Sequence, residues 1–214
     1  MADGSAEVPP GAKLGRGELL RRMALPGDLS VSPILSKRQI GAASVDLRMG
    51  NVVLMVRARG SSHVDPADIA RSQVGNDHAR ESVQQQKHER YELPFRSSFL
   101  LHPGALALVP TLEWVTIPLD LMGEVTARSS WAREGLSIAT ATLIEPGYKG
   151  IVTLELANLG EIPMKLYPGL QLAQISFTTV AGEARRPEKG QFRLSFEPRQ
   201  GKIVNESEKA FLPD

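Results

Sequence analysis

The sequence predicts a mainly β protein, a distorted β-barrel or jelly roll with a short N-terminal helix and a polar insertion. Between residues 93 and 177, short apolar runs alternate with Pro and Gly, and turn signals recur about every ten residues. No long amphipathic helix interrupts them, which argues against a doubly wound α/β fold. The 214 residues, 42% of them hydrophobic, suffice for one sizeable core.

Composition divides the chain into three parts. Residues 1–13 are rich in Gly, Pro and Ala and are expected to form a flexible tail. Residues 14–180 hold the β pattern, and residues 181–214 form a basic C-terminal arm. Inside the β domain, residues 61–92 are polar and glutamine-rich. This insert predicts either a surface helix, with Asp65 near the N-cap and a proline in the first turn, or a mobile loop.

The first elements of the β domain follow from local patterns. Residues 17–25 carry apolar side chains at helical spacing, and Pro26-Gly27 ends the predicted helix. Residues 43–59 are rich in β-branched residues and predict a strand, a turn at Gly50-Asn51 and a second strand.

Composition also excludes several classes of function. The net charge of +1, from 25 basic and 24 acidic residues, gives no basic field for nucleic acid. No apolar run reaches the length of about 18 residues that a membrane span needs, and the first residues lack the apolar stretch of a signal peptide. The absence of cysteine removes thiolate metal ligands and fits a reducing cytoplasm. The four histidines show no HxH or HxxxH spacing, so no zinc site is expected.

Glu155 is the first candidate for chemistry. Side chains alternate along a strand, so "IVTLELAN" places Val152, Leu154 and Leu156 on one face, a natural core face. Glu155 then lies on the other face, together with Thr153. Two interpretations stay open: a surface charge on a solvent face, or a carboxylate in a pocket that transfers protons.

The stretch "ARSSWAREGL" combines hydroxyls and fixed positive charge. Ser129 or Ser130 is expected to cap a short helical turn that runs through Arg133 and ends at Gly135. The free amides of that turn, the two hydroxyls and Arg128 would suit phosphate oxygens. An ordinary capped turn with a surface arginine explains the same residues.

Two further motifs carry carboxylates. "IEPGYKG" is a type II turn by its Pro-Gly pair, and its Glu145 and Tyr148 offer an acceptor for a sugar hydroxyl and a ring for stacking. "ASVDLR" places Asp46 inside a strand, where we expect it to be buried and paired with Arg48 or another arginine.

Read together, four blocks resemble the dCTP deaminase branch of the dUTPase-like superfamily. They are "ASVDLRMGN", "LLHPGALALVPTLEWVTIPLDLMGEVTARSSWAREGL", "IEPGYKGIVTLEL" and "YPGLQLAQISF", in this order. The resemblance implies a dUTPase-like β-barrel or jelly roll, a homotrimer with active sites between subunits, and a deaminase without zinc. Zinc deaminases need a Cys-containing signature that this chain lacks.

The resemblance also implies roles for individual residues. The catalytic glutamate of the family falls on Glu155, which would take a proton from water and pass protons to N3 and the leaving amine. Arg133 would support the tetrahedral intermediate, and Ser129 and the Ala141 carbonyl would help to hold the water. The implied nucleotide contacts are Arg128, Ser129 and Ser130 with the phosphates, Glu145 and Tyr148 with deoxyribose, Gln174, and in the arm Gln200, with Phe196 and Arg199 beside it. Mg²⁺ would accompany the triphosphate, with no metal site on the protein.

Several positions depart from the family pattern. Glu145 stands where aspartate is usual, Thr142-Leu143 replace a His-Arg pair, and Ala105 replaces a glutamate. The main expectation is hydrolytic deamination of dCTP to dUTP and ammonia, a hydrolase step of pyrimidine deoxynucleotide metabolism and dUTP biosynthesis. The alternatives are a bifunctional dUMP-forming enzyme, a dUTP pyrophosphatase, or a regulatory protein that binds nucleotide with weakened catalysis. The expected ligands are dCTP and also dUTP or dTTP, with no nucleic-acid or membrane partner.

Overall fold

A computed structural model describes residues 8–56, 63–67, 70, 88–138, 142–182, 194, 197–198, 204 and 207–212. Strands dominate this part of the chain, and its longest helix has eight residues. The prediction of a mainly β fold with a short N-terminal helix is therefore confirmed. That helix, α1, ends three residues before the Pro26-Gly27 pair.

The helices are α1 (Arg16–Met23), η1 (Lys37–Gln39), α4 (Ser129–Arg133) and η2 (Lys209–Phe211). The strands are β1 (Ser30–Ser32), β2 (Val45–Arg48), β3 (Val52–Val56), β4 (His88–Glu92), β5 (Phe99–Leu101), β6 (Leu106–Thr116), β7 (Leu121–Ala127), β8 (Leu136–Ile138), β9 (Leu143–Ile144), β10 (Lys149–Asn158), β11 (Met164–Leu166) and β12 (Gln171–Thr179).

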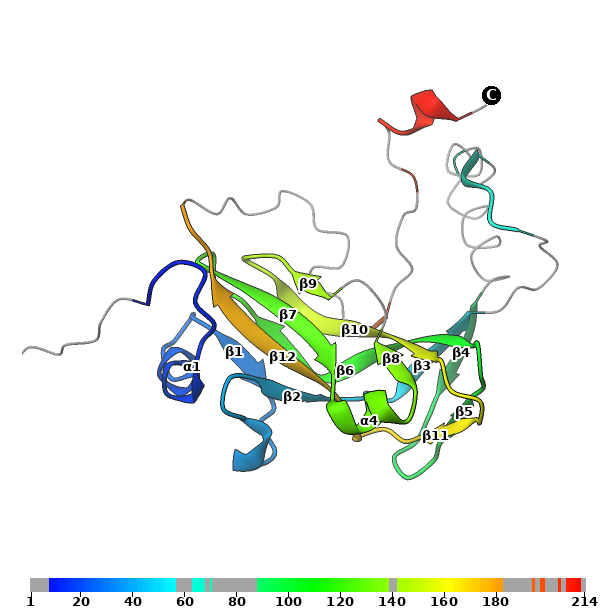
Figure 1. The fold of residues 1–214 in the computed structure, drawn as a ribbon, viewed down its shortest axis with the longest axis horizontal. Helices are drawn as coiled ribbons and strands as arrows, with labels where there is room; N and C mark the ends of the chain where they lie inside the picture. Colours follow the sequence, from blue (N-terminus) through cyan, green and yellow to red (C-terminus); the bar gives the residue numbers. More distant parts are fainter. Residues whose placement is uncertain are drawn as a thin grey trace, which may run out of the picture.

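The strands form three antiparallel sheets (Figure 1). A six-stranded sheet has the order β4-β3-β6-β10-β8, with β1 also paired to β6. A four-stranded sheet has the order β2-β12-β7-β9, and β5 and β11 form a small third sheet. Figure 1 shows α1 beside β1 at one end of the molecule and the β5–β11 pair at the other. Within the described residues no closed barrel is seen, but the isolated bridge Met49↔Thr111 links the end of β2 to β6 and so joins the two large sheets, as a distorted barrel or jelly roll allows.

The predicted strand, turn and strand of residues 43–59 are β2 and β3, but the two strands belong to different sheets. Gly50 makes this crossing possible. Its amide donates to the carbonyl of Pro110 over 2.7 Å, and a Cβ at Gly50 would lie 2.9 Å from Pro110 Cγ. A larger residue would push the connection away from β6.

The polar insert begins and ends in regular structure. Asp65 accepts a hydrogen bond from the Ala67 amide over 2.8 Å, and Pro66 is helical, as the predicted N-cap and first turn require. The last residues of the predicted insert form β4, which pairs with β3 from Val52↔Glu92 to Val56↔His88. A polar strand was missed there because β4 lies at the edge of its sheet, where one face needs no apolar side chains.

The core lies between the two larger sheets and takes side chains from both. In β10 the alternation is as predicted: Val152, Leu154 and Leu156 are buried, whereas Thr153 and Glu155 are half-buried. The largest fully buried side chains of the core include Phe177, Leu47, Met49, Ile117, Leu121 and Leu154. Among the described residues no helix is long and apolar enough to span a bilayer.

Candidate functional site

The stretch that follows β7 forms α4, as predicted, but neither serine caps it. The N-cap is Arg128, whose backbone is extended and whose side chain makes no capping bond. Ser129 and Ser130 are the first two helical residues, and both are exposed. The predicted serine cap is therefore wrong, because the pairing of β7 with β12 extends to Ala127 and places Arg128 at the junction. Gly135, with φ +90°, follows the helix as predicted.

The Arg128 side chain turns back onto the four-stranded sheet. Its Nη1 donates to Gln171 Oε1 over 2.7 Å and lies 3.5 Å from Asp46 Oδ2. Trp131 of α4 donates its indole N–H to the Gln171 carbonyl over 3.1 Å and packs against the core. Gln171, which was not predicted from the sequence, therefore contacts the N-cap residue and the middle of α4.

Asp46 is paired with an arginine, as the sequence predicted, and its partner is Arg128, but the carboxylate is half-buried and not fully buried. Its side chain is 16% exposed. Burial raises the pKa of Asp46 above its ordinary value, while the charges of Arg128 and Arg48 act in the opposite direction. The carboxylate of Asp46 and the guanidinium of Arg128 therefore lie 3.5 Å apart, and both side chains are partly exposed to solvent.

Gln174 lies on β12, directly opposite Asp46 on β2 and Thr126 on β7. Its amide Nε2 donates to Thr126 Oγ1 over 3.3 Å, and its Oε1 accepts from Ser44 Oγ over 3.4 Å. The predicted nucleotide contacts Arg128 and Gln174 thus share the outer face of one sheet with Asp46.

Glu155 belongs to the other large sheet. It lies opposite Leu108 of β6, and no hydrogen bond or ion pair engages its carboxylate within the described residues. A half-buried carboxylate that makes no bond to the described parts of the chain suits contact with a ligand or with water.

The turn that carries Glu145 and Tyr148 has the predicted type II geometry. The Tyr148 amide donates to the Glu145 carbonyl over 3.2 Å, and Gly147 has φ +79°. Glu145 is exposed. The Tyr148 hydroxyl donates to the Ile151 carbonyl, its ring packs against the core, and burial raises the pKa of Tyr148 to about 12. Only the ring of Tyr148 is thus open to the predicted role.

The structure does not join all predicted residues into one site. Ser129, Ser130 and Arg133 are exposed on α4, which packs beside β8, the neighbour of β10. No hydrogen bond or ion pair connects them with Glu155 in the described parts of the chain. Ala141, Phe196, Arg199 and Gln200 lie outside the described residues.

A buried polar cluster beneath Asp46 was not predicted from the sequence. Glu113 Oε1 accepts from Gln39 Nε2 over 2.9 Å and lies 3.1 Å from Arg48 Nη1. Gln39 and Glu113 are fully buried. The signal was present in β6, where Glu113 alternates in phase with the buried Val109 and Val115.

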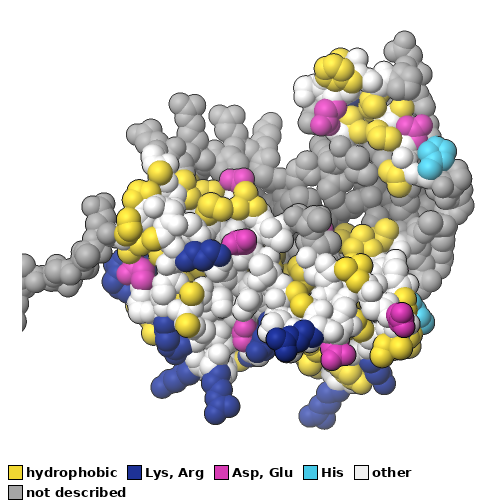
Figure 2. All heavy atoms as spheres, in the orientation of Figure 1, with side chains coloured by type: hydrophobic (Ala, Val, Ile, Leu, Met, Phe, Trp, Pro, Cys, Tyr) yellow, Lys and Arg dark blue, Asp and Glu magenta, His cyan; other side chains and the backbone are white. Residues whose placement is uncertain are grey.

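The face of the molecule in Figure 2 shows no second charged site among the described side chains. On the face in Figure 2 the Lys and Arg side chains that are described stand apart from one another and form no continuous basic patch. No three His, Asp or Glu side chains gather to hold a metal ion in the part of the chain that is described.

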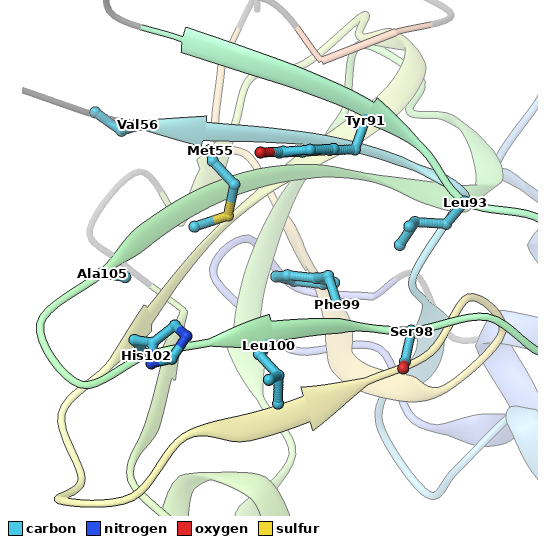
Figure 3. Close-up of a pocket in the computed structure, with 9 residues that line it drawn as sticks. All are labelled: Met55, Val56, Tyr91, Leu93, Ser98, Phe99, Leu100, His102 and Ala105. Atoms are coloured by element: carbon cyan, nitrogen blue, oxygen red, sulfur yellow. The ribbon is translucent and has the colours of Figure 1, made fainter. Parts of the chain in front are cut away.

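A cavity of about 510 Å³ lies between β3, β4 and β5 (Figure 3). Tyr91, Phe99 and Met55 line it, with His102 at one side. None of the site residues predicted from the sequence lines this cavity.

Comparison with known proteins supports the family that the sequence resembles. The profile of a family described as dCTP deaminase-like matches residues 14–180. This chain belongs to the dCTP deaminase-like family. A curated dCTP deaminase of Pectobacterium atrosepticum is 33% identical over 184 residues, which cover 86% of this chain and 92% of that protein.

A solved structure shares the fold of this dCTP deaminase-like chain. The 2′-deoxycytidine 5′-triphosphate deaminase from Agrobacterium tumefaciens superposes with a TM-score of 0.56 at 22% identity, over 80% of this chain. The match covers 49% of the Agrobacterium chain, so the present chain spans about half of its length.

Proposed function

We propose that this protein hydrolyses dCTP to dUTP and ammonia without zinc. The observation that carries the proposal is the match to the Pectobacterium dCTP deaminase, 33% identical over 86% of this chain. The half-buried carboxylate of Glu155, which has no partner among the described residues, supports it. A deamination base needs such a carboxylate within reach of water.

In the proposed reaction Glu155 acts as general base and then as general acid. It takes a proton from water, the resulting hydroxide adds to C4 of cytosine, and Glu155 passes that proton to N3. Glu155 then takes the proton of the new C4 hydroxyl and delivers it to the amine. The C4–N bond breaks, ammonia leaves, and the C4 carbonyl of uracil forms. Arg133 supports the tetrahedral intermediate, while Ser129 and the Ala141 carbonyl hold the water. Without a metal, the rate depends on basicity and positioning.

The nucleotide enters as its Mg²⁺ complex, with the ion bound to substrate phosphates. The proposed contacts are Arg128, Ser129 and Ser130 with the phosphates, Glu145 and Tyr148 with the sugar, and Gln174 and Gln200 with other parts of the nucleotide. Charge-assisted bonds from arginine suit phosphate oxygens.

We further propose a homotrimer that works in the cytoplasm. A site completed by a second copy is compatible with the lack of any described bond between Glu155 and the residues of α4. Light scattering on the purified protein tests this, since a monomeric mass would contradict it.

The activity is tested by incubating the protein with dCTP and Mg²⁺ while ammonia, dUTP, dUMP and pyrophosphate are followed. Ammonia with an equal amount of dUTP is expected. Pyrophosphate with dUMP would indicate the bifunctional alternative, and dCTP binding without any product would contradict catalysis.

Glu155→Gln should abolish ammonia release and leave dCTP binding within about threefold, because the amide cannot accept the proton. Glu124→Gln is the matched control, since Glu124 is also a half-buried strand carboxylate but pairs with Lys13 over 2.8 Å. Full activity of Glu155→Gln would overturn the assignment of the base.

A further inference from the structure

Among the described residues, the Arg128 guanidinium makes side-chain contacts through one nitrogen, Nη1. Its Nη1 contacts both Gln171 and Asp46, at 2.7 Å and 3.5 Å. No bond from Nε or Nη2 is found among the described residues, and the side chain is 36% exposed. A planar guanidinium fixed in this way presents its remaining donors in a defined direction.

Strand register brings the three side chains together. On one side of β12, Gln171 is opposite Arg48 of β2. Asp46, two residues before Arg48 on the same strand, is opposite Gln174. On the other side, the Arg128 amide donates to the Leu172 carbonyl of β12 over 2.9 Å. Arg128 therefore meets Gln171 and Asp46 across three adjacent strands.

A buried network fixes the strand that carries Asp46. The Asp46 carbonyl accepts from Gln39 Nε2 over 3.0 Å, and the same nitrogen donates to Glu113 Oε1 over 2.9 Å. Glu113 Oε2 accepts from the Arg48 amide over 2.8 Å. Buried polar groups with all these partners form a rigid support for β2.

We propose that Asp46 and Gln171 are positioning residues for Arg128. They hold Nη1 so that Nε and Nη2 point at the triphosphate, which lowers the ordering cost of binding. This inference rests on the proposed function, in which Arg128 binds the phosphates. It assigns no contact with the reacting atoms to Asp46 or Gln171.

The test is a double-mutant cycle on the full-length protein. Asp46→Ala and Gln171→Ala are made alone and in an Arg128→Ala background. The KM and kcat for dCTP are measured, together with the Kd for inorganic tripolyphosphate by calorimetry. Each single variant is expected to raise KM and Kd about tenfold with kcat unchanged, since a bond to a charged group is lost. In the Arg128→Ala background neither should have a further effect.

Control variants separate positioning from damage to the fold. Asp46→Asn, which keeps an acceptor oxygen but not the charge, should lie between the wild type and Asp46→Ala in tripolyphosphate affinity. Glu124→Gln removes a charge from the same sheet and should change neither constant. Thermal unfolding identifies any variant that is destabilised, and Asp46→Asn then replaces Asp46→Ala in the cycle.

The outcomes distinguish the two proposals. An equal loss of tripolyphosphate affinity with and without Arg128 overturns the positioning role, as does unchanged affinity in both single variants. Absence of ammonia from dCTP in the wild type overturns the proposed function, whereas the tripolyphosphate cycle still decides the positioning role. If the wild type binds neither dCTP nor tripolyphosphate, both proposals fail.

Discussion

Glu113 and Arg48 form an ion pair that joins the two large sheets through the core. Glu113 Oε1 of β6 lies 3.1 Å from Arg48 Nη1 of β2, and Glu113 is completely buried. Burial raises the pKa of the Glu113 carboxyl, and the hydrogen bonds from Arg48 only partly counteract it. The register of one sheet against the other therefore depends on a buried polar contact in which Gln39 also takes part.

We predict that removing one partner of this ion pair destabilises the fold more than replacing both partners with apolar residues does. Glu113→Leu and Arg48→Met should each lower the free energy of unfolding by about 3–5 kcal/mol, because each leaves a buried group without its partner. The double variant should be more stable than the sum of the two losses implies. Urea unfolding measures all four proteins, and strictly additive losses would show that the pair contributes no coupling.

The pH dependence of stability should also report on Glu113. Because its pKa is raised above the ordinary 4.5, the folded protein binds this proton more tightly than the unfolded chain does. Its contribution to stability is complete below that pH and is lost as the pH rises through the folded-state value. Relative to Glu113→Gln, the wild type should therefore lose stability as the pH rises above the ordinary value of 4.5 and through the raised pKa of Glu113. The opposite slope would mean that Arg48 outweighs burial.

Tyr148→Phe separates the ring from the hydroxyl. The variant should lose about 1 kcal/mol of stability, because the bond to the Ile151 carbonyl disappears. The KM for dCTP should stay unchanged, since the hydroxyl is already engaged within the chain. A large rise in KM would show that the hydroxyl leaves Ile151 to contact the nucleotide.

The raised pKa of Tyr148 predicts that the stability of the fold decreases at alkaline pH. Burial raises its pKa from 10.0 to about 12, so the folded state retains the phenol proton that the unfolded chain loses. Above pH 10 the wild type should therefore lose stability relative to Tyr148→Phe. Unfolding curves at alkaline pH measure the difference.

Gly135→Ala should be much more destabilising than Gly104→Ala. Both glycines have positive φ, +90° and +73°, but a Cβ at Gly135 would lie 2.7 Å from the Gly160 amide nitrogen, while Gly104 has open space. We expect Gly104→Ala to cost about 1 kcal/mol and Gly135→Ala at least about 2 kcal/mol more. Equal losses in urea unfolding would show that backbone conformation, and not crowding, requires Gly135.

Local patterns were sufficient to predict most elements, the polar edge strand β4 excepted, but not which strands lie next to one another. The alternation around Glu155 gave the buried and outer faces of β10 correctly, because strand periodicity is a property of the strand itself. The strands on either side of Gly50 were also correct, yet no local signal showed that they separate into two sheets. That separation depends on pairing with β6 and β12, which are distant in sequence.

The same limit applies to the site. Arg128 and Asp46 were recognised as charged residues in unusual places, and an arginine partner for Asp46 was expected. Gln171 was missed because it is 43 residues from Arg128 and has no unusual local pattern. The serine cap failed for a related reason: the start of α4 is set by how far β7 pairs with β12.

The pairing of β3 with β4 fixes the two ends of a long connection. Five cross-strand residue pairs join β3 to β4, the last of them Val56↔His88. Residues 57–87 connect the end of β3 to the start of β4. The entropy of closing such a loop grows only with the logarithm of its length, so each doubling costs about 0.6 kcal/mol. Closure entropy therefore opposes a change in the length of this connection only weakly, and the buried Ala67 and Ala70 within it mark where a reporter domain should not be inserted.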